Sequence, residues 1–151
     1  MADEHSHLRP DGVGDDAVEA VGKVSEAYEY VVRARGALYE AHQLMGHADG
    51  LFGDAADLLR AAGHPEQADL LDDELVGRNM LDGRCTFQMV EEFDRTYYDV
   101  ATALERQVRE ELMAGRRHVF ESEVKDARST PGRPGHERRP PEGWDPAVVE
   151  L

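Results

Sequence analysis

Residues 15–63 read DDAVEAVGKVSEAYEYVVRARGALYEAHQLMGHADGLFGDAADLLRAAG, and this stretch decides the fold. Large apolar residues recur in it at alternating steps of three and four, the spacing of a helix face that packs against another helix. They are Val21, Val24, Tyr28, Val31, Leu38 and Met45. A second row repeats alanine every seven residues, at Ala20, Ala27, Ala34, Ala41, Ala48, Ala55 and Ala62. Because small side chains let a neighbouring helix approach closely, the two rows predict close, register-specific packing.

Three glycines, Gly46, Gly50 and Gly53, lie within this stretch. A glycine inside a helix costs up to about 1 kcal/mol relative to alanine. We therefore expect one helix over about 15–45 and a second over about 48–62, unless the two form a single bent rod. The sequence Gly63-His64-Pro65 predicts a clear end, because glycine suits the position after a helix and proline cannot continue one.

Two more helices are expected beyond this point. Pro65 suits the first helical position, so a short acidic helix should follow it. The last helix should begin near Asp82 or Thr86, and its apolar period continues to about Arg128. At 1.5 Å per residue its length would be roughly 60 Å. A helix of that length would overhang a small bundle, so either its end protrudes or a second copy of the chain covers it, which leads to the hypothesis of a homodimer.

The predicted fold is therefore all-α, a three- to four-helix antiparallel bundle with two long amphipathic helices and disordered termini. Residues 1–14 are predicted to be a flexible arm, because Pro10, Gly12 and Gly14 punctuate them. Residues 15–128 would form the helical bundle. Residues 129–151 are rich in proline and arginine, and they are predicted to be a disordered tail with an apolar end.

The charge of the chain is strongly negative and unevenly distributed. All of the net charge of −15 resides in residues 1–115, whereas residues 116–151 are neutral overall. A body this acidic repels phosphate, which argues against nucleic-acid binding. There is one cysteine, no run of 18 apolar residues and no hydrophobic leader, so we expect a cytoplasmic protein without a membrane segment.

The first candidate site is a polar row within the apolar seam. Arg35, His42 and Asp49 are spaced seven residues apart, at positions where hydrophobic residues are expected. Such groups are tolerated in a helix interface when they are paired, and Glu92, Asp94 or Asp99 on a facing helix could pair with them. One interpretation is a structural layer that fixes register.

The other interpretation of the polar row is a ligand or divalent-metal site. This site would consist of Arg35, His42, His47 and Asp49, with Asp54 as a further possible metal ligand. A di-iron bundle site needs paired Glu-x-x-His motifs on two helices. The chain has only one, Glu4–His7, which lies in the predicted arm. A bound cofactor is thus not expected, and a divalent ion is kept as the alternative.

The C-terminal third offers two candidate partner-binding elements. Arg116 and Arg117 begin a basic junction that could contact an anionic partner, fold back on the acidic body, or simply favour a helix C-terminus. The end of the chain places apolar side chains after a proline-rich linker, as in a short recognition peptide that could equally pack back on its own bundle. These residues are Trp144, Val148, Val149 and Leu151.

Three segments carry a family resemblance. They are Gly77–Met80, Arg84–Asp94 and Thr130–Glu137, which read GRNM, RCTFQMVEEFD and TPGRPGHE. Together they resemble uncharacterised small helical proteins of high-GC actinobacteria. The resemblance covers most of the chain and implies a bacterial cytosolic origin, but it implies no site residues.

These observations lead to a functional prediction. The sequence has no phosphate-binding loop, nucleophile elbow or catalytic triad spacing. We expect a non-enzymatic interaction or scaffold protein that self-associates and could bind another protein through its tail. The alternative is a bundle that binds a metal or small ligand at the polar row and that could be an enzyme.

Overall fold

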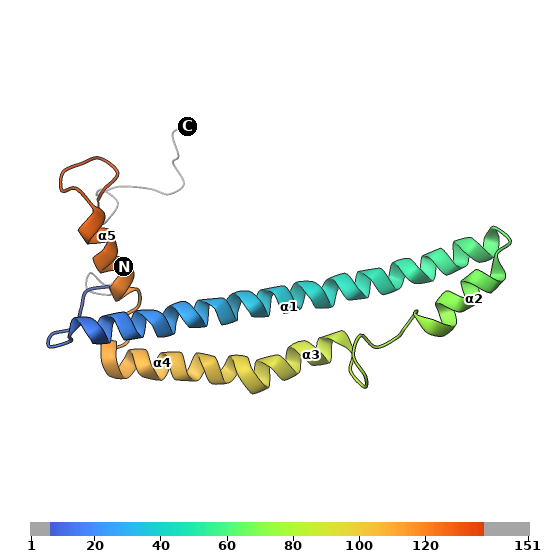
Figure 1. Cartoon of the computed structure of the whole chain (residues 1–151), viewed down its shortest axis with the longest axis horizontal. Helices are drawn as coiled ribbons and strands as arrows, with labels where there is room; N and C mark the ends of the chain where they lie inside the picture. The colour runs from blue at the N-terminus through green and yellow to red at the C-terminus, as the bar shows by residue number, and fades with distance from the viewer. Residues whose placement is uncertain (1–6, 138–151) are drawn as a thin grey trace, which may run out of the picture. The chain divides into compact units, whose positions relative to one another are not determined.

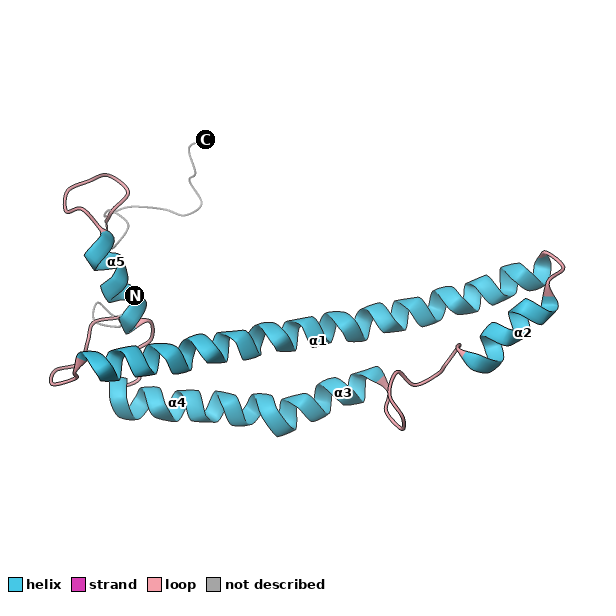
Figure 2. Cartoon of the chain, in the orientation of Figure 1, coloured by secondary structure: helices cyan, strands magenta, loops and turns pink. Residues whose placement is uncertain are grey.

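The computed structural model describes residues 7–137, and all regular secondary structure in this part of the chain is helical (Figure 1) (Figure 2). The elements are α1 (Asp15–Ala61), α2 (Pro65–Glu74), α3 (Thr86–Phe93), the π-helix η1 (Asp94–Tyr98), α4 (Asp99–Met113) and α5 (Val119–Arg128). The predicted all-α class is confirmed. Within residues 7–137, no helix combines the length and the apolar character that a membrane span needs.

The chain divides into two compact units, which are described separately. The central unit comprises Ser25–Glu105, and the terminal unit combines the residues up to Val24 with those from Arg106 onward. Helices α1 and α4 contribute residues to both units.

Helix α1 runs without a break through Gly46, Gly50 and Gly53, so of the two expected arrangements the single continuous helix is the one that forms. Glycine breaks a helix effectively where it takes a positive φ, as Gly63 does at +87° directly after α1. The three interior glycines do not take positive φ values. Their cost is spread over a 47-residue helix that is packed on other helices, and this packing outweighs it.

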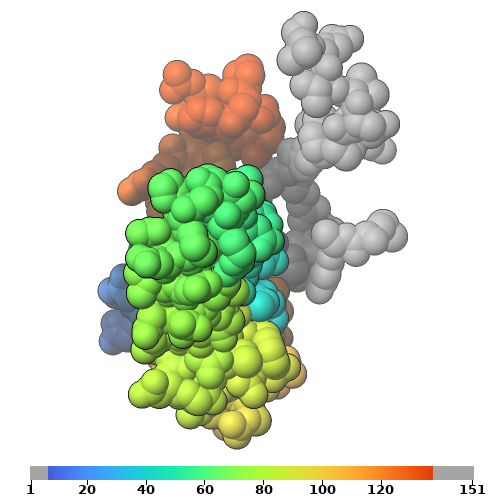
Figure 3. All heavy atoms as spheres, turned by 90° about the vertical axis from the view of Figure 1, so that its right-hand side faces the viewer, coloured from blue at the N-terminus to red at the C-terminus, as the bar shows by residue number. Residues whose placement is uncertain are grey.

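In the central unit, α1 pairs in antiparallel fashion with the continuous segment formed by α3, η1 and α4. Hydrogen bonds join Tyr28 to Thr102, Arg35 to Asp94 and His42 to Thr86. Residue numbers along α1 therefore increase in the direction in which those of the facing segment decrease. Helix α2 returns along the end of α1, where Arg60 bonds Asp69 and Asp72. Figure 3 shows these two green segments packed side by side. Ala56 on α1 and Ala68 on α2 are both buried there.

The long last helix predicted from the sequence ends early. It begins at Thr86, as one of the two expected starts, and includes the wide turn η1, in which the Asp99 N–H bonds the Asp94 carbonyl. It then stops at Met113 instead of running to Arg128. The reason is a cap: Gly115 takes a φ of +76° and its N–H bonds the Arg109 carbonyl. The length that suggested an overhanging helix is therefore absent.

The terminal unit has a small core of its own, formed by Val18, Val21, Met113 and Val119, with Val13, Ala17 and Val108 packed against it. Residues 7–14, predicted as a flexible arm, are held against this unit. The guanidinium of Arg9 binds both carboxylate oxygens of Glu123, each at 2.7 Å, and Arg116 donates to the Leu8 carbonyl at 2.8 Å. Residues 7–14 are thus joined to the terminal unit by an ion pair and by a side-chain hydrogen bond to a backbone carbonyl.

Candidate functional site

The polar row of α1 faces the second helical layer of the central unit. Tyr28, Arg35, His42 and Asp49 recur every seven residues and are all partly buried. Each bonds a different segment of the facing layer: α4, η1, the first residue of α3, and the loop before it. The prediction that Arg35, His42 and Asp49 lie in the packing seam is confirmed by their partial burial and their hydrogen bonds.

Arg35 is the most heavily bonded member of the row. Its Nε and Nη2 bind the two oxygens of Asp94 at 2.7 and 2.8 Å, so the expected pairing with an acid on the facing helix is confirmed for Asp94. The guanidinium also lies over the rings of Tyr39 and Tyr98, at 4.9 and 4.7 Å from their centroids. The hydrogen bonds from Arg35 hold the pKa of the Asp94 carboxyl below its ordinary value. Because its Nε and Nη2 bind Asp94 and its guanidinium lies over two tyrosine rings, Arg35 joins α1 to η1.

The other predicted ligands are kept apart. The ring of His42 bonds the Thr86 hydroxyl at 2.7 Å through Nδ1, and Asp49 accepts the Gly77 N–H at 2.7 Å. His47 is exposed. Among residues 7–137, no group of three or more His, Cys, Asp or Glu side chains is gathered closely enough to hold a metal ion. The seven-residue spacing places the row on one face but separates successive members by about 10 Å along the axis.

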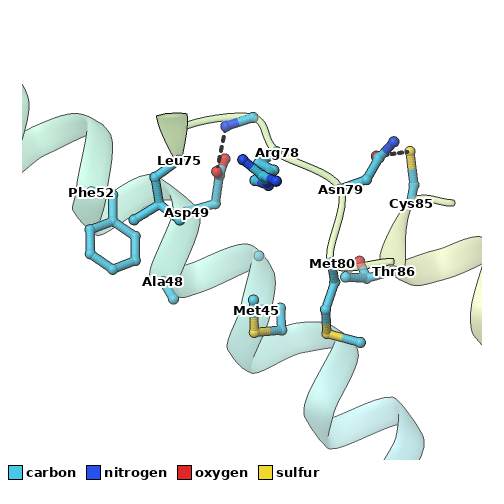
Figure 4. A pocket seen from close by; sticks show the side chains of 12 residues that line it. Met45, Ala48, Asp49, Phe52, Leu75, Arg78, Asn79, Met80, Cys85 and Thr86 are labelled. Atoms are coloured by element: carbon cyan, nitrogen blue, oxygen red, sulfur yellow. Dashed lines mark hydrogen bonds between the residues drawn. The ribbon is translucent and has the colours of Figure 1, made fainter. Parts of the chain in front are cut away.

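A pocket of about 200 Å³ lies in the central unit, between α1 and the loop after α2. Figure 4 shows Met45 and Phe52 of α1 facing Leu75 and Met80 across it, with Asp49 bonded to the loop at its edge. Its walls are thus mainly apolar, with a few polar groups at one side. Sequence reasoning singled out Asp49 but missed the loop residues, because no local pattern indicates which part of α1 the loop folds against.

A continuous strip of uncharged side chains lies beside the pairing seam, and we call it the apolar face. On α1 it consists of Ala27, Val31, Ala34, Leu38, Ala41, Met45, Ala48, Phe52 and Ala55. On the facing segment it consists of Phe93, Tyr97, Val100 and Leu104. Viewed along each helix from its N-terminus to its C-terminus, these positions are rotated in the same direction from the residues that pair in the seam. Because the two helices run antiparallel, both rows therefore lie on the same side of the helix pair.

The apolar face is only partly covered. Tyr97, Val100 and Leu104 are 58, 52 and 56 % exposed, and Met45 and Phe52 are 42 and 39 % exposed. The rings of Phe93 and Tyr97 stack at 5.8 Å. Ala27 and Ala34 are exposed, although the alanine row is the most regular packing pattern of the sequence. The alanine row predicts a neighbouring helix packed closely on it, and at Ala27 and Ala34 the central unit provides no such helix.

Of the predicted partner-binding residues in the C-terminal third, the structure describes only the two arginines. Arg116 is engaged by the Leu8 carbonyl, whereas the Arg117 side chain is exposed and its carbonyl accepts a bond from His7 at 2.7 Å. Trp144, Val148, Val149 and Leu151 lie outside the described residues.

No family model matches this sequence, and neither a curated protein nor a solved structure is significantly similar to it. The interpretation of the candidate site therefore rests on the geometry of this chain alone.

Proposed function

We propose that this protein is a cytoplasmic interaction or scaffold module without a catalytic role, and that it associates with itself through the apolar face. The observation that carries the proposal is the exposure of Tyr97, Val100 and Leu104 beside the open alanine row. A contiguous apolar strip of this kind is typical of a surface that another protein covers.

The energetics favour covering this face. Burying a large apolar side chain completely contributes roughly 1.5–3 kcal/mol, so the exposed half of each of these residues is worth about 1 kcal/mol. Several such residues together can offset part of the free-energy cost of association. The strip also lacks charge, although the chain carries a net charge of −15. Contact along it therefore avoids placing acidic side chains against each other.

The proposal is tested by the molar mass of the purified full chain, measured by light scattering over a range of concentrations. We expect the wild-type chain to assemble and Leu104→Glu to be monomeric, because the variant places a charge in the contact. Ala103→Glu is the matched control: it adds the same charge to the same helix at an exposed position outside the face. A wild-type chain that stays monomeric up to high micromolar concentration would overturn the proposal.

The pocket supports a second candidate, the binding of a small apolar molecule. Met45, Phe52, Leu75 and Met80 form walls suited to an aromatic ring. Titration with indole, followed by the NMR signals of the methionine methyl groups, tests this. Saturable shifts of Met45 and Met80 would support ligand binding, and unchanged signals at millimolar indole would exclude it.

A further inference from the structure

We infer that the apolar face is covered by a second copy of this chain, whose α1 runs antiparallel to the first about a two-fold axis between Leu38 and Ala41. This inference rests on the proposed function and specifies the partner and the register. It concerns only the part of α1 in the central unit.

Large and small side chains alternate along the face. From Ala27 to Ala55 the positions follow steps of four and three, and alanine alternates with a larger residue at every step. In a two-fold interface the same patch serves both copies, so it must fit itself. An alternating strip does so when it is reversed, because each large side chain then meets an alanine.

One reversed register pairs eight of the nine positions of the strip and leaves only Ala55 without a facing position within it. When facing residue numbers add to 79, Ala27 faces Phe52, Val31 faces Ala48, Ala34 faces Met45 and Leu38 faces Ala41. Every pair joins one large residue to one alanine. Alanine at each contact lets the helix axes approach to the short end of the usual 8–10 Å range.

Shifting the register by seven residues keeps the alternation. A sum of 72 leaves Ala48, Phe52 and Ala55 without facing positions within the strip. A sum of 86 also pairs eight of the nine positions, but it moves the second copy toward the end of α1, where Ala56 is already buried beside α2. The centred register therefore covers the most open surface.

The exposed area of the face is large enough for a specific contact. Its five most exposed large residues are 39–58 % exposed, which leaves on the order of 500 Å² per copy and about 1,000 Å² for a pair. This is the lower limit for a specific interface. In this register, residues 27–34 of the second copy lie opposite Met45–Phe52, and Met45 and Phe52 also line the pocket.

The test is disulfide formation between two single-cysteine chains, both carrying Cys85→Ser. One chain carries Ala34→Cys and is mixed in turn with chains carrying Met45→Cys, Phe52→Cys or Leu38→Cys. These partners correspond to sums of 79, 86 and 72. Because a disulfide needs Cα atoms within about 7 Å, only the facing pair should crosslink under mild oxidation. Leu44→Cys, exposed on another side of α1, is the control.

The expected result is a crosslinked dimer from Ala34→Cys with Met45→Cys and little from the other mixtures. Crosslinking only with Phe52→Cys, only with Leu38→Cys or only with Leu44→Cys would overturn the register and leave self-association intact. Chains that assemble by light scattering without any crosslink would also overturn it. Monomeric chains in every mixture and in the wild type would overturn both the register and the proposed function.

Discussion

Arg35 on α1 donates two hydrogen bonds to the carboxylate of Asp94 at the start of η1, from Nε to Oδ1 at 2.7 Å and from Nη2 to Oδ2 at 2.8 Å. The two residues are 59 positions apart in the sequence, and their bond fixes the antiparallel register of the central unit. The guanidinium also lies over the rings of Tyr39 and Tyr98, which favour its position. The Arg35–Asp94 pair therefore joins the two helical layers, and its removal should be visible in the stability of the fold.

Asp94→Asn should lower the melting temperature at neutral pH and have little effect in strong acid. Arg35 depresses the pKa of Asp94 in the folded state, so the pair stabilises the fold above the ordinary carboxyl value of about 3.9. That stabilisation is lost as pH falls through the depressed folded value. Melting curves at pH 7 and pH 2.5 check this. Glu91→Gln, which removes an exposed acid from the same helical segment, is the control and should show no such difference.

Gly22→Ala should destabilise the terminal unit although alanine is the better helix former. A Cβ at position 22 would lie 2.9 Å from Cβ and 3.1 Å from Cγ of Phe120. Overpacking of this kind typically costs about 1–3 kcal/mol. Gly36→Ala, in the same helix with open space around it, should instead stabilise by up to about 1 kcal/mol. Urea unfolding of both variants measures the difference, and equal effects would contradict the close contact.

Met113→Ala should be among the most damaging substitutions in the terminal unit. The side chain is 1 % exposed within the small core, and truncating a buried methionine costs about 2–5 kcal/mol. Leu112→Ala removes a neighbour that is 47 % exposed and should cost much less. Denaturant midpoints of the two variants check this, since similar losses would mean that Met113 is not in a packed core.

Asp49→Ala should loosen the loop that closes the pocket. The carboxylate accepts the Gly77 N–H at 2.7 Å, and the loss of this bond exposes the amide. Hydrogen exchange at Gly77 should accelerate about tenfold, as expected for a bond of about 1.4 kcal/mol. Asp54→Ala, an exposed acid on the same helix, should leave this amide unchanged. An unchanged rate in Asp49→Ala would mean that other contacts hold the loop.

Self-association should strengthen with salt. Two copies that each carry a net charge of −15 repel one another at long range, and the Debye length shortens from about 10 Å at 0.1 M to 3 Å at 1 M. Because the apolar face itself is uncharged, screening removes repulsion without weakening the contact. Sedimentation equilibrium in 0.05 M and 0.5 M NaCl should show tighter association at the higher salt. Weaker association there would indicate an interface of ion pairs instead.

The local signals at the end of α1 and the start of α2 were reliable, whereas the glycines within α1 did not mark a break. Gly63 and Pro65 ended α1 and began α2 as expected, and the seven-residue spacing placed Arg35 on the packing face. The break at Gly115 carried the same kind of signal, a glycine after a helical run, but the apolar period resumed at Val119 and concealed it. Periodicity alone does not distinguish one helix from two in succession.

Features that depend on contacts between distant segments could not be predicted from the sequence. The identity of Asp94 as the partner of Arg35, among three candidate acids, is decided by the register of the hairpin. The pocket depends on how the loop after α2 folds against Met45 and Phe52. The regular spacing of the alanine row can be seen in the sequence. Whether another part of the same chain covers this row depends on which face of α1 packs against α3 and α4, and the spacing does not indicate this.

The wide turn η1 absorbs one residue within the facing helical segment. A π-helical turn accommodates one residue more than an α-helical turn, so removing one residue from Asp94–Tyr98 would restore an ordinary helix. Because the deleted residue is the one that the turn absorbs, α4 would keep the orientation in which Glu105 is buried and hydrogen-bonded by Ser25. A one-residue deletion within α4 before Glu105 would instead rotate the residues that follow it by about 100°. Homologous chains that keep this hairpin are therefore expected to gain or lose a single residue at this turn more readily than elsewhere in the helix.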